Sequence, residues 1–351
     1  MQLVNFKDIY IQPQVIEDIN YLVNSERRYE HLRAVNVTAF IPELLKFISN
    51  QRRHWKTIII FRTTFGTRSQ IEDVFRISSK TIEKLELFHV WCKDNLELSS
   101  SSTFNFPQLQ HLRIVYHHID TDPWINCYIA SVPKLISITL GNAGDSQMKQ
   151  LILNATCLKN LSLFGKFQDS DFFNHLSETL PPRLEEFTFN DILSSSHDDF
   201  NLSFFNCFFK SQSNTLKRFE TDALLEPEEL STAFKMKNLH TLKIKSFDYN
   251  RETIRNHIDS LIVTEIPEAS LKVFIVQIMD QNLLELLALH ARGLEELRAQ
   301  ELHATNVSNP TWFPKLQKVQ VNFFNPEISD QLGTKAENER THFEQLLLDE
   351  D

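Results

Sequence analysis

The sequence predicts an α/β solenoid in which short parallel strands are stacked side by side and joined by longer crossover segments. Two observations lead to this prediction. The first is a frame of six residues, apolar-x-x-apolar-x-apolar, of which Leu158 to Leu163 (LKNLSL) is a clear copy. The second is spacing, because the first positions of thirteen such frames follow one another at steps of 22 to 32 residues. A fixed period of this size is typical of repeat proteins, so one unbroken stack is expected.

The frame recurs along nearly the whole chain, with one weaker copy at Leu216/Phe219/Thr221. A period of about 20 to 29 residues with this pattern is the signature of leucine-rich repeats. We therefore predict a curved horseshoe with parallel strands on its concave face. The other copies are Phe6/Ile9/Ile11, Leu32/Val35/Val37, Trp55/Ile58/Ile60, Ile82/Leu85/Leu87, Leu109/Leu112/Ile114, Leu135/Ile138/Leu140, Leu158/Leu161/Leu163, Leu184/Phe187/Phe189, Leu239/Leu242/Ile244, Leu271/Phe274/Val276, Leu294/Leu297/Ala299 and Leu316/Val319/Val321.

The segments between the frames are long enough to cross over a sheet, as parallel strands require. Several have the apolar spacing of a helix, which predicts helices and irregular turns on the convex face. Gly293 stands where the C-terminal cap of one of these helices is expected. The predicted helix faces are Met148/Leu151/Ile152/Ala155, Phe200/Phe204/Phe208 (after a loop at Ser194–Ser196), Ile254/Ile258/Leu261/Ile262 and Leu283/Leu286/Leu287/His290.

The predicted domain organisation is a single solenoid of about thirteen irregular repeats over residues 1–325. Residues 326–351 are expected to form a capping helix with an acidic tail that ends in Leu346 to Asp351 (LLLDED). Six glycines in 351 residues argue against phosphate-binding loops.

Composition and charge indicate which kinds of partner and which cellular compartment to expect. The net charge of −10 is spread along the chain with no basic run, which argues against nucleic acid and anionic lipid as partners. The first residues lack a basic segment followed by a long apolar one, and no apolar run is long enough to span a membrane. The four cysteines share no spacing typical of disulfides or zinc. An intracellular protein, cytoplasmic or nuclear, is expected.

No motif of a known catalytic class is present, so an enzyme is not expected, and neither is a cofactor or a metal. The segment His117 to Asp122 (HHIDTD) resembles a metal site, but adjacent histidines on an extended chain point in opposite directions, and a solvated loop is the better interpretation. His89 and Cys92 have an H-x-x-C spacing without a second pair. An enzyme whose site lies in the loops stays an alternative for which no residues are nominated.

Candidate binding residues follow from the alternation of side chains along a strand. The third, fifth and seventh residues of each frame are expected to face the concave solvent. In the second repeat this assignment gives Ala34, Asn36 and Thr38. Further along, it predicts an apolar row of about 19 Å, four strand steps from Phe61 to Phe164, and then a mixed charged surface. The candidate residues are Ile59, Phe61, Phe88, Val115, Phe164, Lys243, Lys245 and Arg298.

Two alternatives to a binding row stay open at this point. The seventh residue of a frame could turn inward where the strand ends, or a convex loop could fold over the row.

The repeats resemble the irregular leucine-rich repeats of F-box proteins, from about Phe6 to Val321. The resemblance rests on Pro-x-Leu openings at Pro107, Pro133 and Pro314, and on Ser25 to Leu32 (SERRYEHL), which is similar to the segment that follows the F-box in some insect members. In that family the F-box binds the adaptor of an SCF ubiquitin ligase, and the repeats hold the substrate.

The resemblance implies a non-catalytic protein-interaction module that recognises the substrate for a ubiquitin ligase. Only five residues precede Phe6, so the chain as given has no room for an F-box, and the SCF adaptor is expected as a partner only if an F-box lies upstream. The alternative is a free-standing scaffold or regulatory protein without a ligase link. The identity of the protein partner does not follow from the sequence.

Overall fold

The computed structural model of the chain describes fourteen stretches. These are residues 8–12, 21, 28–50, 54–93, 103–115, 129–141, 151–165, 180, 183–190, 203–222, 225, 227–244, 270–304 and 311–324. The structural statements below refer to these residues. The chain divides into two compact units, Met1–Asn201 and Leu202–Asp351, and each unit is described by itself.

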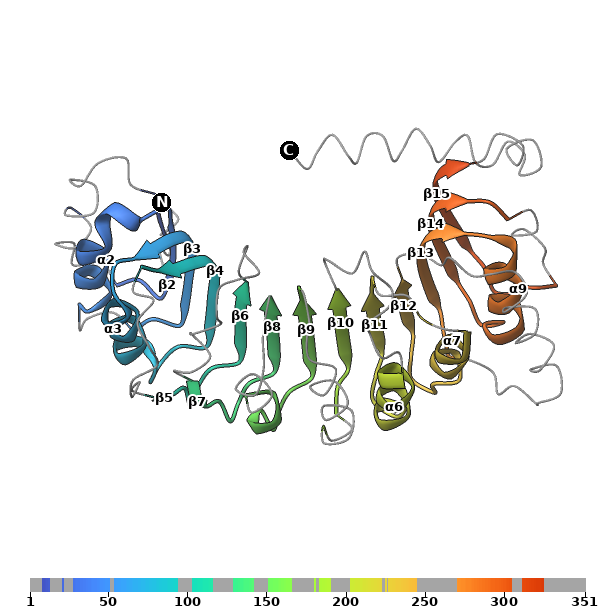
Figure 1. Cartoon of the computed structure of the whole chain (residues 1–351), viewed down its shortest axis with the longest axis horizontal. Helices are drawn as coiled ribbons and strands as arrows, with labels where there is room; N and C mark the ends of the chain where they lie inside the picture. Colours follow the sequence, from blue (N-terminus) through green and yellow to red (C-terminus); the bar gives the residue numbers. More distant parts are fainter. Residues whose placement is uncertain are drawn as a thin grey trace, which may run out of the picture. The chain divides into compact units, whose positions relative to one another are not determined.

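The dominant element is a parallel sheet of thirteen strands whose order follows the sequence (Figure 1). Each predicted frame provides one strand, so the α/β class and the parallel repeat are confirmed. In unit 1 the strands are β1 (Asp8–Ile11), β2 (His31–Val35), β3 (Thr57–Phe65), β4 (Lys84–Cys92), β6 (His111–Val115), β8 (Ser137–Gly141), β9 (Asn160–Phe164) and β10 (Glu186–Asn190). In unit 2 they are β11 (Arg218–Thr221), β12 (Thr241–Ile244), β13 (Val273–Met279), β14 (Glu296–Leu302) and β15 (Lys318–Phe324). A separate pair, β5 (Phe104–Asn105) and β7 (Ile129–Ser131), also runs parallel.

The pairing register confirms twelve of the thirteen predicted frames and corrects the second. Leu32 pairs with Ile9 on one side and with Ile58 on the other, so Leu32 occupies the fourth position of its repeat. The first position is Tyr29, which is buried, and the sixth is Ala34, which is fully buried. The predicted frame Leu32/Val35/Val37 was therefore three residues too late. With Tyr29 in place, the first two steps become 23 and 26 residues.

Alternation of buried and exposed side chains follows the corrected frame in both units. Positions four and six are buried from β1 to β14, as in Leu161 and Leu163 of β9 or Leu242 and Ile244 of β12. At β15, the last strand of the sheet, Val319 is only half-buried. Because a parallel sheet needs a covering layer to bury one face, the helices supply the rest of the core.

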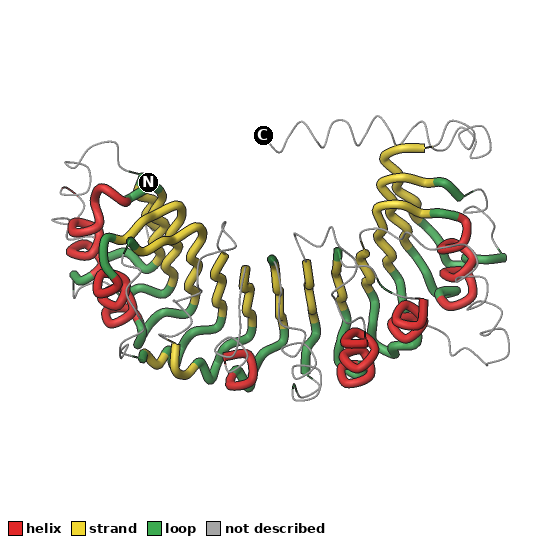
Figure 2. Tube along the Cα trace, in the orientation of Figure 1, coloured by secondary structure: helices red, strands yellow, loops and turns green. Residues whose placement is uncertain are grey.

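Helices α2 (Ile41–Ile48) and α3 (Arg68–Ser78) belong to unit 1, with a 3-10 turn, η1 (Thr38–Phe40), before α2. Helices α6 (Ser203–Gln212), α7 (Pro227–Phe234) and α9 (Gln281–His290) belong to unit 2. In each unit they lie on one side of the strands (Figure 2). Ring contacts show how they pack: Phe209 of α6 lies 4.9 Å from Phe219 of β11, and Phe234 of α7 lies 6.2 Å from Phe274 of β13, between ring centroids.

The helix predictions have mixed outcomes. Helix α9 contains one of the predicted faces, and its residues Leu283, Leu286, Leu287 and His290 are all buried. Its end is corrected, because the cap residue is Ala291 and Gly293 lies in the following turn. Phe208 is buried in α6, and residues 151–154 are helical, with Leu151 and Ile152 buried. Met148, Phe200, residues 194–196 and 254–262, and the predicted capping helix at 326–351 lie outside the described residues.

A tight turn introduces several strands and explains the Pro-x-Leu openings. The amide of Leu109 donates to the carbonyl of Phe106 at 3.3 Å, and Leu135 donates to Val132 at 3.1 Å in the same way. Leu316 and Phe313 repeat the contact at 3.2 Å. Proline fits the second place of such a turn because its φ is already near the required value. The apolar residues on both sides of the first two turns are buried, and in the third turn Phe313 is buried while Leu316 is half-buried.

Candidate functional site

The candidate site lies on the face of the sheet opposite the buried positions four and six. We call it the open face, defined by positions three, five and seven of each frame. Among the described residues no helix lies on this side of the strands of either unit (Figure 2). Side chains on the open face are therefore available to contact another molecule, and the two units present different chemistry there.

In unit 1 the open face carries a row of apolar side chains at position seven. Phe61 pairs with Phe88, and Phe88 pairs with Val115, so the three stand side by side on β3, β4 and β6. We call these three residues the apolar row. The ring centroids of Phe61 and Phe88 are 5.6 Å apart at an interplanar angle of 47°. Ile59 lies two residues before Phe61, at position five of the same strand.

Phe164 belongs to the same position on β9 but does not adjoin the apolar row. It pairs with Gly141 on one side and with Asn190 on the other. A Cβ atom at Gly141 would lie 3.1 Å from Cγ1 and 3.2 Å from Cα of Val115, so Gly141 packs closely against Val115. The predicted row therefore has a gap at Gly141, and Phe164 stands apart from its first three members.

Position eight, which follows the apolar row, has an unusual backbone. Asn36, Arg62 and His89 have φ of 55°, 49° and 50°, and Gly165 at the same position has φ of 116°. These are all the position-eight residues described in unit 1. Such a residue interrupts the strict alternation of side chains along the strand, while the register between β3 and β4 continues unchanged from Phe61↔Phe88 to Thr63↔Val90. Thr63 and Val90, the next residues of β3 and β4, are accordingly buried.

The sequence left open whether position seven turns inward, and the answer differs between strands. Val35 of β2 is buried, whereas Phe61, Phe88 and Val115 are half-buried. On β3 and β4 the next core side chains come at position nine. Phe61 and Phe88 are shielded by each other and by two arginines.

Three arginines on this face of unit 1 lie over aromatic rings. The guanidinium carbon of Arg113 lies 4.7 Å from the centroid of Phe88, and that of Arg62 lies 5.2 Å from Phe61. Arg33 lies 5.6 Å from the ring of Tyr10, which is 55% exposed. Within the described stretches, none of the three arginines has a carboxylate at ion-pair distance.

These arginines were not among the predicted candidates. Arg33 was missed because of the frame error in the second repeat, which placed Ala34, Asn36 and Thr38 on the open face. The structure buries Ala34 in the core, puts exposed Arg33 at position five, and places Val35 at position seven, where Val35 is also buried. The signal was available, since Tyr29-x-x-Leu32-x-Ala34 also fits the frame if alanine is allowed at position six.

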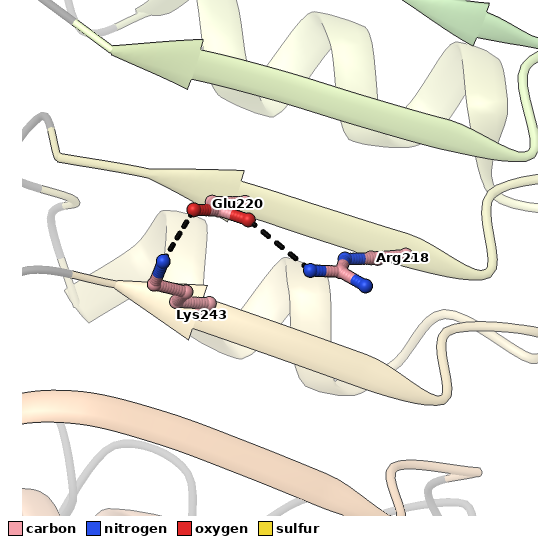
Figure 3. Close-up of polar contacts among 3 residues, drawn as sticks. All are labelled: Arg218, Glu220 and Lys243. Atoms are coloured by element: carbon pink, nitrogen blue, oxygen red, sulfur yellow. Dashed lines mark hydrogen bonds and ion pairs between the residues drawn. The ribbon is translucent and has the colours of Figure 1, made fainter. Parts of the chain in front are cut away.

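The open face of unit 2 carries charges that are paired with one another. Glu220 of β11 accepts from Arg218 at 3.4 Å and from Lys243 of β12 (Figure 3). Glu296 of β14 repeats this arrangement, accepting from Arg298 at 2.8 Å and from Lys318 of β15 at 2.9 Å. The two described members of the predicted charged site, Lys243 and Arg298, are thus both engaged. Lys245 lies outside the described residues.

Glu296 shows the electrostatic result of this pairing. Its side chain is 17% exposed, and its two cationic neighbours donate hydrogen bonds to it. The bond from Arg298, helped by the one from Lys318, lowers the pKa of the Glu296 carboxyl against the opposing effect of burial. The carboxylate form is therefore favoured in the folded state.

The described residues hold no cluster of three or more His, Cys, Asp or Glu side chains suited to a metal ion. His89 has a left-handed backbone, and its ring centroid lies 5.7 Å from that of Phe61. The segment 117–122 lies outside the described residues. No helix in the described part of the chain is long and apolar enough to cross a membrane.

Comparison with known proteins adds no family assignment. No model of a protein family matches the chain, and no curated protein matches it.

Proposed function

We propose that this protein is a non-catalytic leucine-rich repeat solenoid that binds a protein partner on the open face of unit 1. In this proposal the strands line the concave side of a curved stack, and the helices and turns form its convex side. The apolar row is the centre of the interface, and the arginines around it form its polar rim.

The observation that carries the proposal is the pair of rings at Phe61 and Phe88. A large aromatic side chain on a strand usually belongs to the buried face, yet these two stand at position seven on the open face. Aromatic residues and arginine are the types most enriched at the energetic centres of protein interfaces. A partner that covers the rings would bury apolar surface that the folded chain leaves in contact with water.

We further propose that the partner is a substrate and that the chain is the recognition part of an F-box/leucine-rich repeat receptor of an SCF-type ubiquitin ligase. This part rests on the resemblance of the repeat openings. Co-purification of the SCF adaptor with the natural gene product, followed by ubiquitin transfer to the bound protein, tests it. A bound partner without adaptor or ubiquitin transfer would favour the free-standing scaffold instead.

The binding site is tested with the double variant Phe61→Thr/Phe88→Thr. Threonine keeps the β-propensity of the strands but removes both rings. We expect this variant to stay folded and to lose at least about tenfold in affinity for partners captured by the wild-type protein, because central aromatic residues commonly contribute 2 kcal/mol or more each. Quantitative mass spectrometry of captured proteins and a binding titration measure the loss.

The matched control is Val273→Thr/Ile275→Thr, which changes two half-buried open-face residues of β13 in unit 2. It should capture the same partners as the wild type. If Phe61→Thr/Phe88→Thr keeps wild-type affinity while folded, the apolar row is not the interface.

A further inference from the structure

We propose that the partner segment recognised by unit 1 is an extended acidic peptide with two carboxylates about four residues apart and a large apolar side chain between them. This inference rests on the proposed function, because it names the chemistry of the partner for the same site. It comes from the arginines and their spacing on the open face.

The first step is the availability of the arginines. Arg33, Arg62 and Arg113 have no carboxylate within ion-pair distance in the described stretches, unlike Lys84, which lies 3.0 Å from Glu86. A ring attracts a guanidinium by its charge and supplies no carboxylate, so the N–H donors of the guanidinium can still bind a partner carboxylate in pairs. A partner carboxylate would thus find donors without displacing an internal ion pair.

The second step is the spacing. Arg33, Ile59, Glu86 and Arg113 pair in succession, so they form one row at position five across β2, β3, β4 and β6. Three strand steps of about 4.8 Å separate Arg33 from Arg113, which is about 14 Å. An extended peptide advances about 3.4 Å per residue, so carboxylates four residues apart would reach both arginines.

The third step is the surface between the two arginines. Ile59 lies beside Arg33 in the row, and Phe61 and Phe88 lie two residues further along β3 and β4. Glu86, which would repel an acidic peptide, is only 16% exposed and already bound to Lys84. The centre of the row is therefore apolar and close to neutral, which suits a large apolar side chain and not a third carboxylate.

Arginines over aromatic rings also suit a single-stranded nucleic acid, where bases stack on rings. The net charge of −10 and the small number of cations on this face favour the peptide, because affinity for nucleic acid depends chiefly on neutralising many phosphates. The nucleic acid is kept as an outcome of the test.

The test uses the whole chain and a fluorescein-labelled peptide of sequence Gly-Ser-Asp-Ser-Phe-Ser-Asp-Ser-Gly, followed by fluorescence anisotropy at low salt. A second peptide has Asn in place of both Asp, and a single-stranded oligonucleotide of ten thymidines is the third probe. We expect the Asp peptide to bind at least about tenfold more tightly than the other two. The variant Arg33→Gln/Arg113→Gln should remove this preference.

The control variant is Arg218→Gln/Arg298→Gln, which removes two arginines that are already paired in unit 2. It should bind the Asp peptide like the wild type. Circular dichroism and melting confirm that both variants are folded.

Three outcomes would overturn the inference. The first is equal binding of the Asp and Asn peptides, and the second is wild-type binding by Arg33→Gln/Arg113→Gln. The third is no binding of the Asp peptide at a concentration of about 1 mM, since even a Kd of that size corresponds to a binding free energy of only about 4 kcal/mol. Tighter binding of the oligonucleotide would replace the peptide with a nucleic acid. None of these decides the proposed function, which fails only if Phe61→Thr/Phe88→Thr still captures the natural partners.

Discussion

The two units have the same buried face and different open faces. In both, positions four and six carry buried side chains from β1 to β14, such as Leu161 in unit 1 and Leu242 in unit 2. On the open face of unit 1, arginines lie over aromatic rings. On that of unit 2, Glu220 and Glu296 each hold two cations.

This difference bears on how each face would bind. A charge that already belongs to an ion pair can contribute to a new interface only if the ion pair is broken or if both of its residues are buried together. The cost of removing water from these charges then offsets much of the new electrostatic attraction. The arginines that lie over rings in unit 1 have no such ion pair among the described residues. Internal pairing therefore makes the charged face of unit 2 a weaker candidate than the apolar row, although its residues look equally suitable in the sequence.

The largest expected effect tests what the units share. Leu161 in unit 1 and Leu242 in unit 2 occupy the same buried position four. Leu161→Asp and Leu242→Asp should each lower the free energy of unfolding by several kcal/mol, because each buries a carboxylate without a partner. Urea denaturation followed by circular dichroism measures both.

The neighbouring variant Ser162→Asp is the control, since Ser162 is half-buried on the open face at position five. It should change the free energy of unfolding by much less than Leu161→Asp. A Leu161→Asp protein with wild-type stability would contradict the assigned register.

A smaller effect, about 1 kcal/mol, should distinguish the units at position eight. Arg62 has a left-handed backbone, in which any residue with a Cβ is strained, so Arg62→Gly should be more stable than Arg62→Ala. Glu301 holds the same position in β14 without a positive φ. There the order should reverse, with Glu301→Ala more stable than Glu301→Gly by about 0.5 to 1 kcal/mol.

Thermal unfolding of the four variants gives both differences. The same order at the two positions would mean that the left-handed backbone at Arg62 stores no conformational strain.

The smallest effect concerns the ion pairs of unit 2. The pKa of Glu296 is lowered in the folded state by Arg298 and Lys318. Its carboxylate therefore stabilises the fold at pH values above the pKa of an unfolded Glu, and this stabilisation is lost as the pH falls through the lower folded pKa. Glu296→Gln should cost less than about 1 kcal/mol at neutral pH, and nothing in acid below that folded pKa.

Unfolding titrations of wild type and Glu296→Gln between neutral and acidic pH test this. Glu186→Gln is the control, because Glu186 is exposed on β10 and has no cation at ion-pair distance among the residues described. A cost for Glu296→Gln that grows as the pH falls would contradict the lowered pKa.

The second repeat shows where prediction from sequence stops. Tyr29 and Leu32 both fit the first position of a frame, since the frame asks only for an apolar side chain, and the sequence alone prefers the longer aliphatic run Leu32/Val35/Val37. Pairing with β1 and β3 places Tyr29 at the first position, because β2 must form aligned hydrogen bonds with both neighbouring strands at once. A shift of three residues moves every side chain to the opposite face.

The sequence by itself determined the repeat, the parallel strands and the positions of nearly all core residues. These follow from a local alternation of apolar and variable residues that recurs in each repeat. It also nominated Ile59, Phe61, Phe88 and Val115 for the open face. Only the tertiary structure decided which charges are paired and which arginines lie over rings. Several of those contacts join residues of neighbouring repeats, as in Arg33 over Tyr10 or Lys243 with Glu220, and strand register sets their distance.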